Sequence, residues 1–225
     1  MRIRIATLFT LDGAGRLRRV NDLVGQPAPR FFLGRTARGN VWAVRHDVSE
    51  KLVRAFEALC ASEPDGNEFL VPPYGARAYE ALLAGEAPVR HVGAGPAYRF
   101  PNELREVSGA VAVTSDNSEL LDPYMSAWRE DVTAGVPFVV VVNDGHAVSV
   151  CCSVRVTSAA HEAGVETHAD FRGRGYAALA AIAWARAVRA AGSIPLYSTS
   201  WENSASRAVA RKLGLVRFGT DLHIT

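Results

Sequence analysis

The chain has 225 residues, of which 48% are hydrophobic and 21% are charged, and its formal net charge at pH 7 is +2. These values are ordinary for a globular enzyme of one domain or two small ones with a sizeable core. So small a net charge gives no reason to expect nucleic acid as a partner. No run of eighteen apolar residues occurs, so we expect no membrane span. The start, MRIRIATLFTLDG, lacks the apolar core of a secretory signal, so we expect a cytoplasmic protein.

The three cysteines predict buried apolar side chains rather than a redox or metal centre. Cys151 and Cys152 are neighbours in a stretch with strand character, so their side chains point to opposite faces. That arrangement suits neither a disulfide nor a shared metal ion, whereas cysteine is often buried as a small hydrophobe. We therefore expect no metal, and unpaired cysteines fit the reducing cytoplasm.

The first half of the chain has mixed strand and helix character. Gly39 and Asn40 separate two short runs with strand character, which predicts a hairpin. An apolar stripe that follows Asp47 and Ser49 predicts a helix capped by one of these two residues. The expected elements are strands at 30–35 and 40–45, helices from 49 to about 60 and from 74 to 83, and a connection or irregular edge strand over 86–101.

The second half has a clearer alternation of strands and helices. Asn143-Asp144-Gly145 between two β-branched runs is a strong hairpin signal. The expected order is a strand at 110–114, a helix over 117–135 with Pro123 near its first turn or at a break, two strands within 136–157, a strand at 162–169, a helix to about 191, a strand at 194–200, a helix over 204–214 and a last strand over 215–225.

The stretch HADFRGRGYAAL, residues 168–179, places two glycines and two arginines where a strand hands over to a helix. A helix N-terminus carries unpaired N–H groups and a partial positive charge. Gly173 and Gly175 lack the Cβ atoms that would block access to these groups, and Arg172 and Arg174 add charge beside them. This combination predicts a phosphate-binding turn.

Two phosphate-binding patterns compete for this turn. Gly173, Gly175 and Ala178 fit the dinucleotide pattern G-x-G-x-x-G/A, which would favour a nicotinamide-dependent oxidoreductase. That pattern needs a buried apolar strand ahead of the turn and an acidic residue about twenty positions beyond it. The preceding strand is polar at its end and the next acid is Glu202, so the dinucleotide pattern fits poorly.

The second pattern is that of the GNAT superfamily of N-acetyltransferases, which the chain resembles over about residues 107–225. The family's pyrophosphate loop reads (Arg or Gln)-x-x-Gly-x-(Gly or Ala), and Arg172, Gly175 and Ala177 occupy that frame. WENSASRAVARKLGL is similar to the family's second signature, with Asn203 and Ser206 near the cofactor.

The resemblance implies an α/β (α+β) fold with a mixed, mostly antiparallel central sheet, splayed strands and flanking helices. It implies a GNAT domain over 106–225, preceded over 1–105 by an α/β segment that is either a degenerate half-copy of the fold or a substrate-capping module. The implied cosubstrate is acetyl-CoA, and the implied acceptor is a primary amine of a small molecule or peptide in a bacterial cytoplasm. A homodimer is compatible with this assignment. The residues implied to bind the cofactor are Val165 and Thr167 by their backbone, Arg172, Gly173, Arg174, Gly175, Tyr176, Ala177, Asn203 and Ser206.

The resemblance also implies a general base on the strand ahead of the loop, because the amine must lose a proton before it attacks. The candidates are His161, Glu162 and Glu166, with His161 on the opposite face of a regular strand from both glutamates. Many family members carry a tyrosine as the acid for the leaving thiolate where this chain has Ala210. Tyr197 is the candidate substitute, together with Ser204, Ser206 or a water. The missing tyrosine leaves a second function open, a non-catalytic module that binds acyl-CoA.

Overall fold

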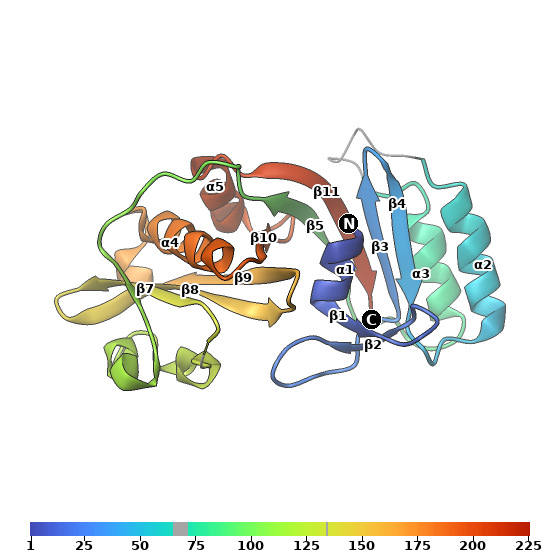
Figure 1. Cartoon of the computed structure of the whole chain (residues 1–225). Coiled ribbons are helices and arrows are strands. Elements are labelled where there is room, and N and C mark those ends of the chain that lie inside the picture. The colour runs from blue at the N-terminus through green and yellow to red at the C-terminus, as the bar shows by residue number, and fades with distance from the viewer. Residues whose placement is uncertain (65–71, 134) are drawn as a thin grey trace. The chain divides into compact units, whose positions relative to one another are not determined.

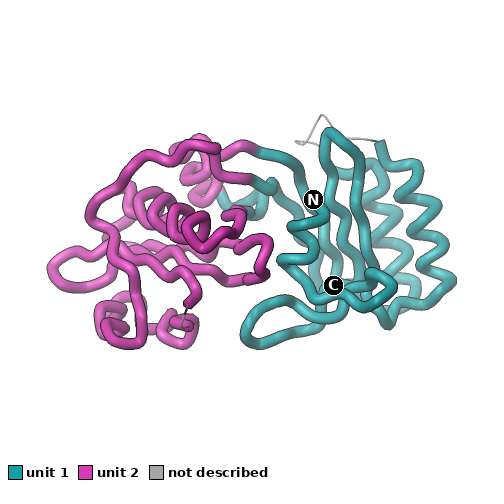
Figure 2. The backbone as a smooth tube through the Cα atoms, viewed as in Figure 1, with its two compact units in different colours: residues 1–98, 198–203, 217–225 teal, residues 99–197, 204–216 magenta. Residues whose placement is uncertain are grey.

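The computed structural model describes residues 1–64, 72–133 and 135–225, which form two compact units (Figure 2). Unit 1 comprises Met1–Tyr98, Ser198–Asn203 and Arg217–Thr225, and unit 2 comprises Arg99–Tyr197 and Ser204–Val216. Both units are therefore discontinuous in sequence, and the last strand of the chain lies mainly in unit 1. The division expected from the sequence, at residue 105, placed that strand in the second domain instead. Within the described residues, no helix combines the length and apolar character needed to cross a membrane.

Unit 1 is a four-stranded sheet with helices on both faces (Figure 1). Its strand order is β4-β3-β11-β5, and β3 pairs antiparallel with both β4 and β11. A separate two-stranded ribbon joins β1 to β2. The elements of this unit are α1 Arg2–Leu8, β1 Phe9–Leu11, β2 Leu17–Val20, β3 Phe31–Thr36, β4 Gly39–Val44, α2 Glu50–Ala61, α3 Ala76–Ala84, β5 Val92–Arg99 and β11 Val216–Ile224.

The sequence of β3 explains why unit 1 has two cores. Successive side chains of a strand point to opposite faces. Phe31 therefore stacks on Phe56 of α2 with ring centroids 4.4 Å apart, whereas Phe32 meets Phe9 on the other face, with centroids 5.6 Å apart. Three consecutive apolar residues, Phe31 to Leu33, can all be buried because α2 and α3 cover one face and α1 the other.

Unit 2 contains a five-stranded sheet of order β10-β9-β8-β7-β6, in which β9 and β10 are parallel and the other pairs antiparallel. The helix α4 covers one face and the 3₁₀ helices η1 and η2 lie on the other (Figure 1). The elements of this unit are β6 Ala110–Ala112, η1 Ser115–Leu121, η2 Ser126–Asp131, β7 Phe138–Asn143, β8 His146–Val156, β9 Ala160–Thr167, η3 Ala169–Phe171, α4 Tyr176–Ala190, β10 Ile194–Ser198 and α5 Ser204–Lys212.

Most expected elements are confirmed. The hairpin turn after β7 has Asp144 at φ 49° and Gly145 at φ 82°, the left-handed pair that the sequence predicted. Ser49 rather than Asp47 caps α2, since its hydroxyl accepts the N–H of Leu52. The cysteines are buried and unpaired, as expected. The mostly antiparallel sheet with flanking helices is also confirmed.

Two expectations about elements are wrong. The helix expected over 117–135 is replaced by η1 and η2, because Pro123 has no N–H to donate and restricts the residue before it. Residue 134 of that expected helix lies outside the described residues. The second error concerns 86–101, where β5 is not an edge strand: β11 lies on one side, and Thr199 and Trp201 donate N–H bonds to its Pro96 and Ala94 carbonyls.

Candidate functional site

The parallel strands β9 and β10 separate partway along their length. Their pairing runs from Ile194↔Ala160 to Leu196↔Glu162, whereas β9 continues to Thr167 and remains paired with β8 as far as Ser149↔Thr167. The second half of β9 therefore keeps its β8 partner after β10 has turned away. Such a divergence leaves room along one edge of β9 for a ligand.

The backbone of β9 directs hydrogen-bonding groups toward that edge. Peptide groups alternate sides along a strand. The N–H of His168 donates to Val148 on β8, while the carbonyl of Ala159 accepts the N–H of Ile194 on the β10 side. By this alternation the peptide groups of Val165 and Thr167 point toward the edge that β10 leaves. They can pair with an extended chain that carries amides, in the manner of an added strand.

The end of β9 leads through η3 to a glycine turn and the N-terminus of α4. Gly173 and Gly175 have φ of 78° and 87°, a conformation that other residues rarely adopt. Gly175 is the N-cap of α4, and no side chain caps that helix. The first N–H groups of α4 therefore have no partner within the helix. A Cβ added at Gly173 would meet no atom within 4 Å, so open space adjoins this backbone.

Three cations surround the turn. Arg172 Nε donates to the Thr167 carbonyl over 3.2 Å, and Arg174 lies over the Phe171 ring, 5.2 Å from its centroid. Lys212, at the end of α5, brings its Nζ to 2.6 Å from the position that a Cβ of Gly175 would occupy. Sequence reasoning missed Lys212, since only the packing of α5 places it at the turn. Free N–H groups, glycine backbone and three cations fit a diphosphate.

The two faces of β9 carry different chemical groups. Glu162, Gly164 and Glu166 share the face on which η2 lies: Trp128 Nε1 donates to Glu166 Oε2 over 2.6 Å, and the same indole lies over Gly164. Glu162 is buried, with 4% of its surface exposed, and stands where β10 leaves β9. The β9 register is regular, because the irregularity lies on β8, so the two glutamates do share a face.

His161 lies on the other face, beneath α4. Its Nδ1 is 2.9 Å from the hydroxyl of Ser153, which also accepts the indole N–H of Trp184 over 2.9 Å. Burial lowers the pKa of His161 below its usual value. The structure therefore brings Glu162 and Glu166 to one face and separates His161 from both.

The remaining predicted residues lie around α5. The phenol of Tyr197, a buried residue, lies 2.6 Å from the Ser206 hydroxyl and 3.3 Å from the Ser206 carbonyl. Ala210 is also buried. Asn203 belongs to the 198–203 segment of unit 1, where its N–H donates to the Ser200 hydroxyl. The structure thus joins Tyr197 to Ser206. Tyr176 and Ala177 form the first turn of α4, as predicted.

A parallel strand pair that opens beside an uncapped helix N-terminus can accommodate an extended ligand that bears phosphate. The family model described as GNAT acetyltransferase matches residues 104–219, a little more than half of the chain. The chain therefore belongs to the GNAT acetyltransferase family, a family of acyltransferases. No curated protein matches the chain.

Solved structures of GNAT proteins share this fold at low sequence identity. The GCN5-related N-acetyltransferase-like protein of Streptococcus suis 89/1591 is 16% identical, with a TM-score of 0.52 over 88% of this chain and 85% of that one. A GNAT-family acetyltransferase of Colwellia psychrerythraea is 12% identical, with a TM-score of 0.53 over 82% and 75%. A GNAT-family protein of Novosphingobium aromaticivorans DSM 12444 is 18% identical, with a TM-score of 0.51 over 61% of this chain and 66% of that one, just under two thirds of its length.

Proposed function

We propose that the protein transfers the acetyl group of acetyl-CoA to a primary amine of a small molecule or peptide. The observation that carries the proposal is the opening between β9 and β10, which leads to the uncapped N-terminus of α4. Membership of the GNAT acetyltransferase family supports the choice of acetyl-CoA as cosubstrate. Acetyl-CoA also joins an amide-bearing arm to a diphosphate, which are the two groups that the strand opening and the helix N-terminus can bind.

Each part of the cosubstrate has a matching group on the chain. The amide-bearing arm would lie along β9 and pair with the peptide groups of Val165 and Thr167. The diphosphate would meet the N–H groups that follow Gly175, with Arg172 and Lys212 beside it. When bound, acetyl-CoA supplies an activated thioester carbonyl.

Glu162 is the general base that we propose. A primary amine with a pKa near about 10 is protonated at neutral pH, so a group at the site must accept its proton before nitrogen attacks the thioester carbonyl. The Glu162 carboxylate stands where the two strands part, on the face away from α4. His161 lies on the opposite face of β9, under α4, and Glu166 lies four residues beyond the point where β10 leaves β9, which argues against either as the base.

As the amide bond forms, the carbon–sulfur bond breaks and the sulfur needs a proton. We propose that Tyr197 donates this proton. The Ser206 hydroxyl, which is hydrogen-bonded to the Tyr197 phenol, can then supply a proton to the Tyr197 oxygen. This pair would substitute for the tyrosine that many family members carry at the position of Ala210.

The test combines coenzyme binding with turnover. Calorimetric titration with CoA should show binding with a measurable dissociation constant. With at least one amine of a panel, the protein should release CoA thiol from acetyl-CoA. Glu162→Gln should lower kcat by about 10² to 10⁴-fold while CoA affinity stays constant, because a base contributes about that factor. Glu166→Gln and His161→Gln are matched controls that should change kcat by less than about tenfold.

Each failure has a separate meaning. Absence of CoA binding would refute the cosubstrate, and normal turnover by Glu162→Gln would refute the base. The second candidate function is a non-catalytic acyl-CoA-binding module. It is favoured by Ala210, which is buried where many family members carry the tyrosine that protonates the thiolate. Tight CoA binding without thiol release for any amine would select that function instead.

A further inference from the structure

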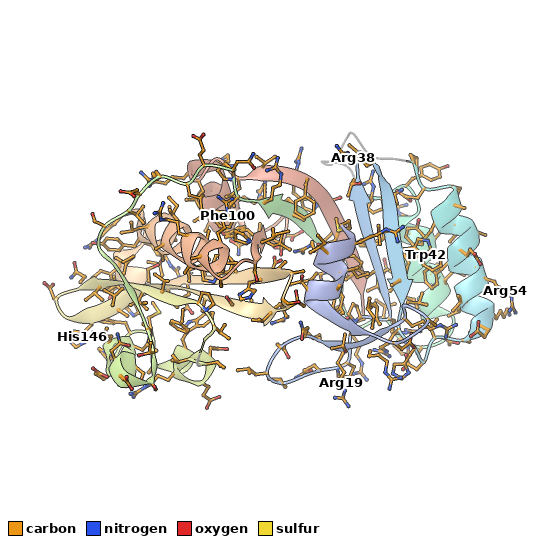
Figure 3. All side chains as sticks on the ribbon, in the orientation of Figure 1. Arg19, Arg38, Trp42, Arg54, Phe100 and His146 are labelled. Carbon is orange, nitrogen blue, oxygen red and sulfur yellow. The ribbon has the colours of Figure 1, made fainter. Side chains whose placement is uncertain are left out.

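A cavity of about 700 Å³ lies within unit 1, on residues that the coenzyme site does not use. Its size falls in the range of small-molecule sites, about 300 to 1,000 Å³. The basic side chains that line it come from four separate parts of the chain: Arg18 and Arg19 on β2, Arg30 ahead of β3, Arg45 and His46 after β4, and Arg90 ahead of β5. Arg19 is labelled in Figure 3.

The lining carries a large excess of positive charge. Five of its residues are arginines, which stay protonated in proteins, and the acidic side chain among them is that of Asp47. The lining side chains therefore carry an excess of four positive charges, and Glu86 beside Arg30 offsets one of them. The whole chain has a net charge of only +2, so this concentration is local.

Hydrogen bonds to backbone carbonyls hold two of these arginines in place. Arg30 is 7% exposed and donates to the carbonyls of Leu83 and Ala87, each over 2.9 Å, with Glu86 at 3.7 Å. Arg19 donates to the Gly25 carbonyl over 2.9 Å. A carbonyl accepts a hydrogen bond without neutralising the guanidinium.

Besides Arg30, which has Glu86 beside it, two of the cavity arginines have acidic neighbours. Arg45 forms a two-bond ion pair with Asp47, with bond lengths of 2.7 and 3.0 Å. Arg18 lies close enough to Asp12 for its positive charge to attract the Asp12 carboxylate. Arg90 is exposed, and the described residues include no acidic partner for its guanidinium. Like charges gathered around a hollow repel one another unless an anion joins them.

We propose that this cavity binds a small molecule carrying two or more phosphate or carboxylate groups. The planar guanidinium fork matches the oxygen atoms of both groups with paired hydrogen bonds. A pocket of this size suits a compact polyanion. Because its arginines come from four segments, such a ligand would also tie together the β1–β2 ribbon and the ends of β3, β4 and β5.

The experiment uses the full chain and two probes, pyrophosphate and citrate, at constant ionic strength. Calorimetry and thermal shift should show both binding to the wild type. The double variant Arg18→Gln with Arg90→Gln should lose at least tenfold in affinity and keep its CoA affinity. Arg38→Gln with Arg54→Gln is the matched control, since it removes two exposed arginines of the same unit that lie outside the cavity (Figure 3).

Four outcomes would overturn the proposal: no binding of either probe by the wild type, an equal loss in the control variant, unchanged affinity in the double variant, or tighter binding of a short oligonucleotide than of either probe. Circular dichroism tests whether the double variant folds. If it does not, the single variant Arg90→Gln, whose side chain is exposed, must lose affinity for both probes.

Discussion

Replacing Gly173 with alanine should weaken CoA binding by at least tenfold, and the effect can be separated from backbone strain. Gly173 has φ 78°, so alanine there should cost about 1–2 kcal/mol of stability. For a chain of this size, that corresponds to a fall in Tm of roughly 2 to 8 °C. The added methyl group would enter the open space through which a diphosphate would reach the N–H groups of α4.

Gly192 provides the matched control. It has φ 81°, and a Cβ there also meets no atom within 4 Å, so Gly192→Ala should lower Tm by the same amount. It lies beyond the other end of the 15-residue helix α4, about 22 Å from the turn. Gly192→Ala should therefore bind CoA like the wild type.

The assay pairs a thermal melt with calorimetric titration of CoA for both variants. Equal losses of Tm with a loss of affinity in Gly173→Ala alone would support contact at the turn. Equal losses of affinity in both variants would mean that strain in α4 accounts for the effect. Wild-type affinity in Gly173→Ala would refute the assignment of the turn.

Three further outcomes are expected. Asp221→Asn should destabilise the fold by about 3–5 kcal/mol in chemical denaturation, since it leaves the buried Arg4 guanidinium without its carboxylate. Burial alone would raise the pKa of Asp221, but the charge and hydrogen bonds of its neighbours, chiefly Arg4, hold it below the usual value. The wild type should therefore keep the stabilisation from the Arg4–Asp221 ion pair above pH about 3.9 and lose it as the pH falls through the pKa of Asp221 in the folded protein. In thermal melts recorded over a series of pH values, Asp221→Asn should not show this loss of stability. Glu63→Gln should cost about 3–5 kcal/mol, and Tyr79→Phe less, because the buried Glu63 carboxylate pairs with the buried Arg35 guanidinium and accepts the Tyr79 hydroxyl and the N–H groups of Tyr74 and Gly75 just ahead of α3. A denaturation midpoint of Glu63→Gln equal to that of the wild type would contradict this. Lys212→Met should weaken CoA binding severalfold in calorimetry with an unchanged Tm, since the side chain is exposed, and unchanged affinity would remove it from the site.

Features that adjacent residues determine could be predicted from the sequence. The turn at Asp144-Gly145 and the glycines at 173 and 175 each need left-handed backbone, which the residue types reveal directly. The family assignment depended on such local patterns at proper separation. By contrast, the pairing of β11 with β3 joins segments nearly 190 residues apart, and no local signal specifies it.

Only part of the candidate site could be predicted from the sequence. The two-residue period of a strand separates His161 from Glu162 and Glu166, but the choice of face required knowing that α4 covers one of them. Trp128 could not be assigned to Glu166 from sequence, because the helix expected there is broken by Pro123 into two short 3₁₀ segments.

The spacing of groups along β9 limits the kind of acetyl donor that fits. Glu162 and Thr167 are five residues apart, which is about 16 Å in an extended strand, and the glycine turn lies beyond Thr167. In the proposed reaction a donor must therefore place its acetyl group and its phosphates far apart, with hydrogen-bonding groups between them to meet the open edge at Val165. In acetyl phosphate the two groups are adjacent, so it could not reach the carboxylate and the helix N-terminus together. Acetyl-CoA separates them by an amide-bearing arm, which in the proposed reaction would lie between the splayed strands.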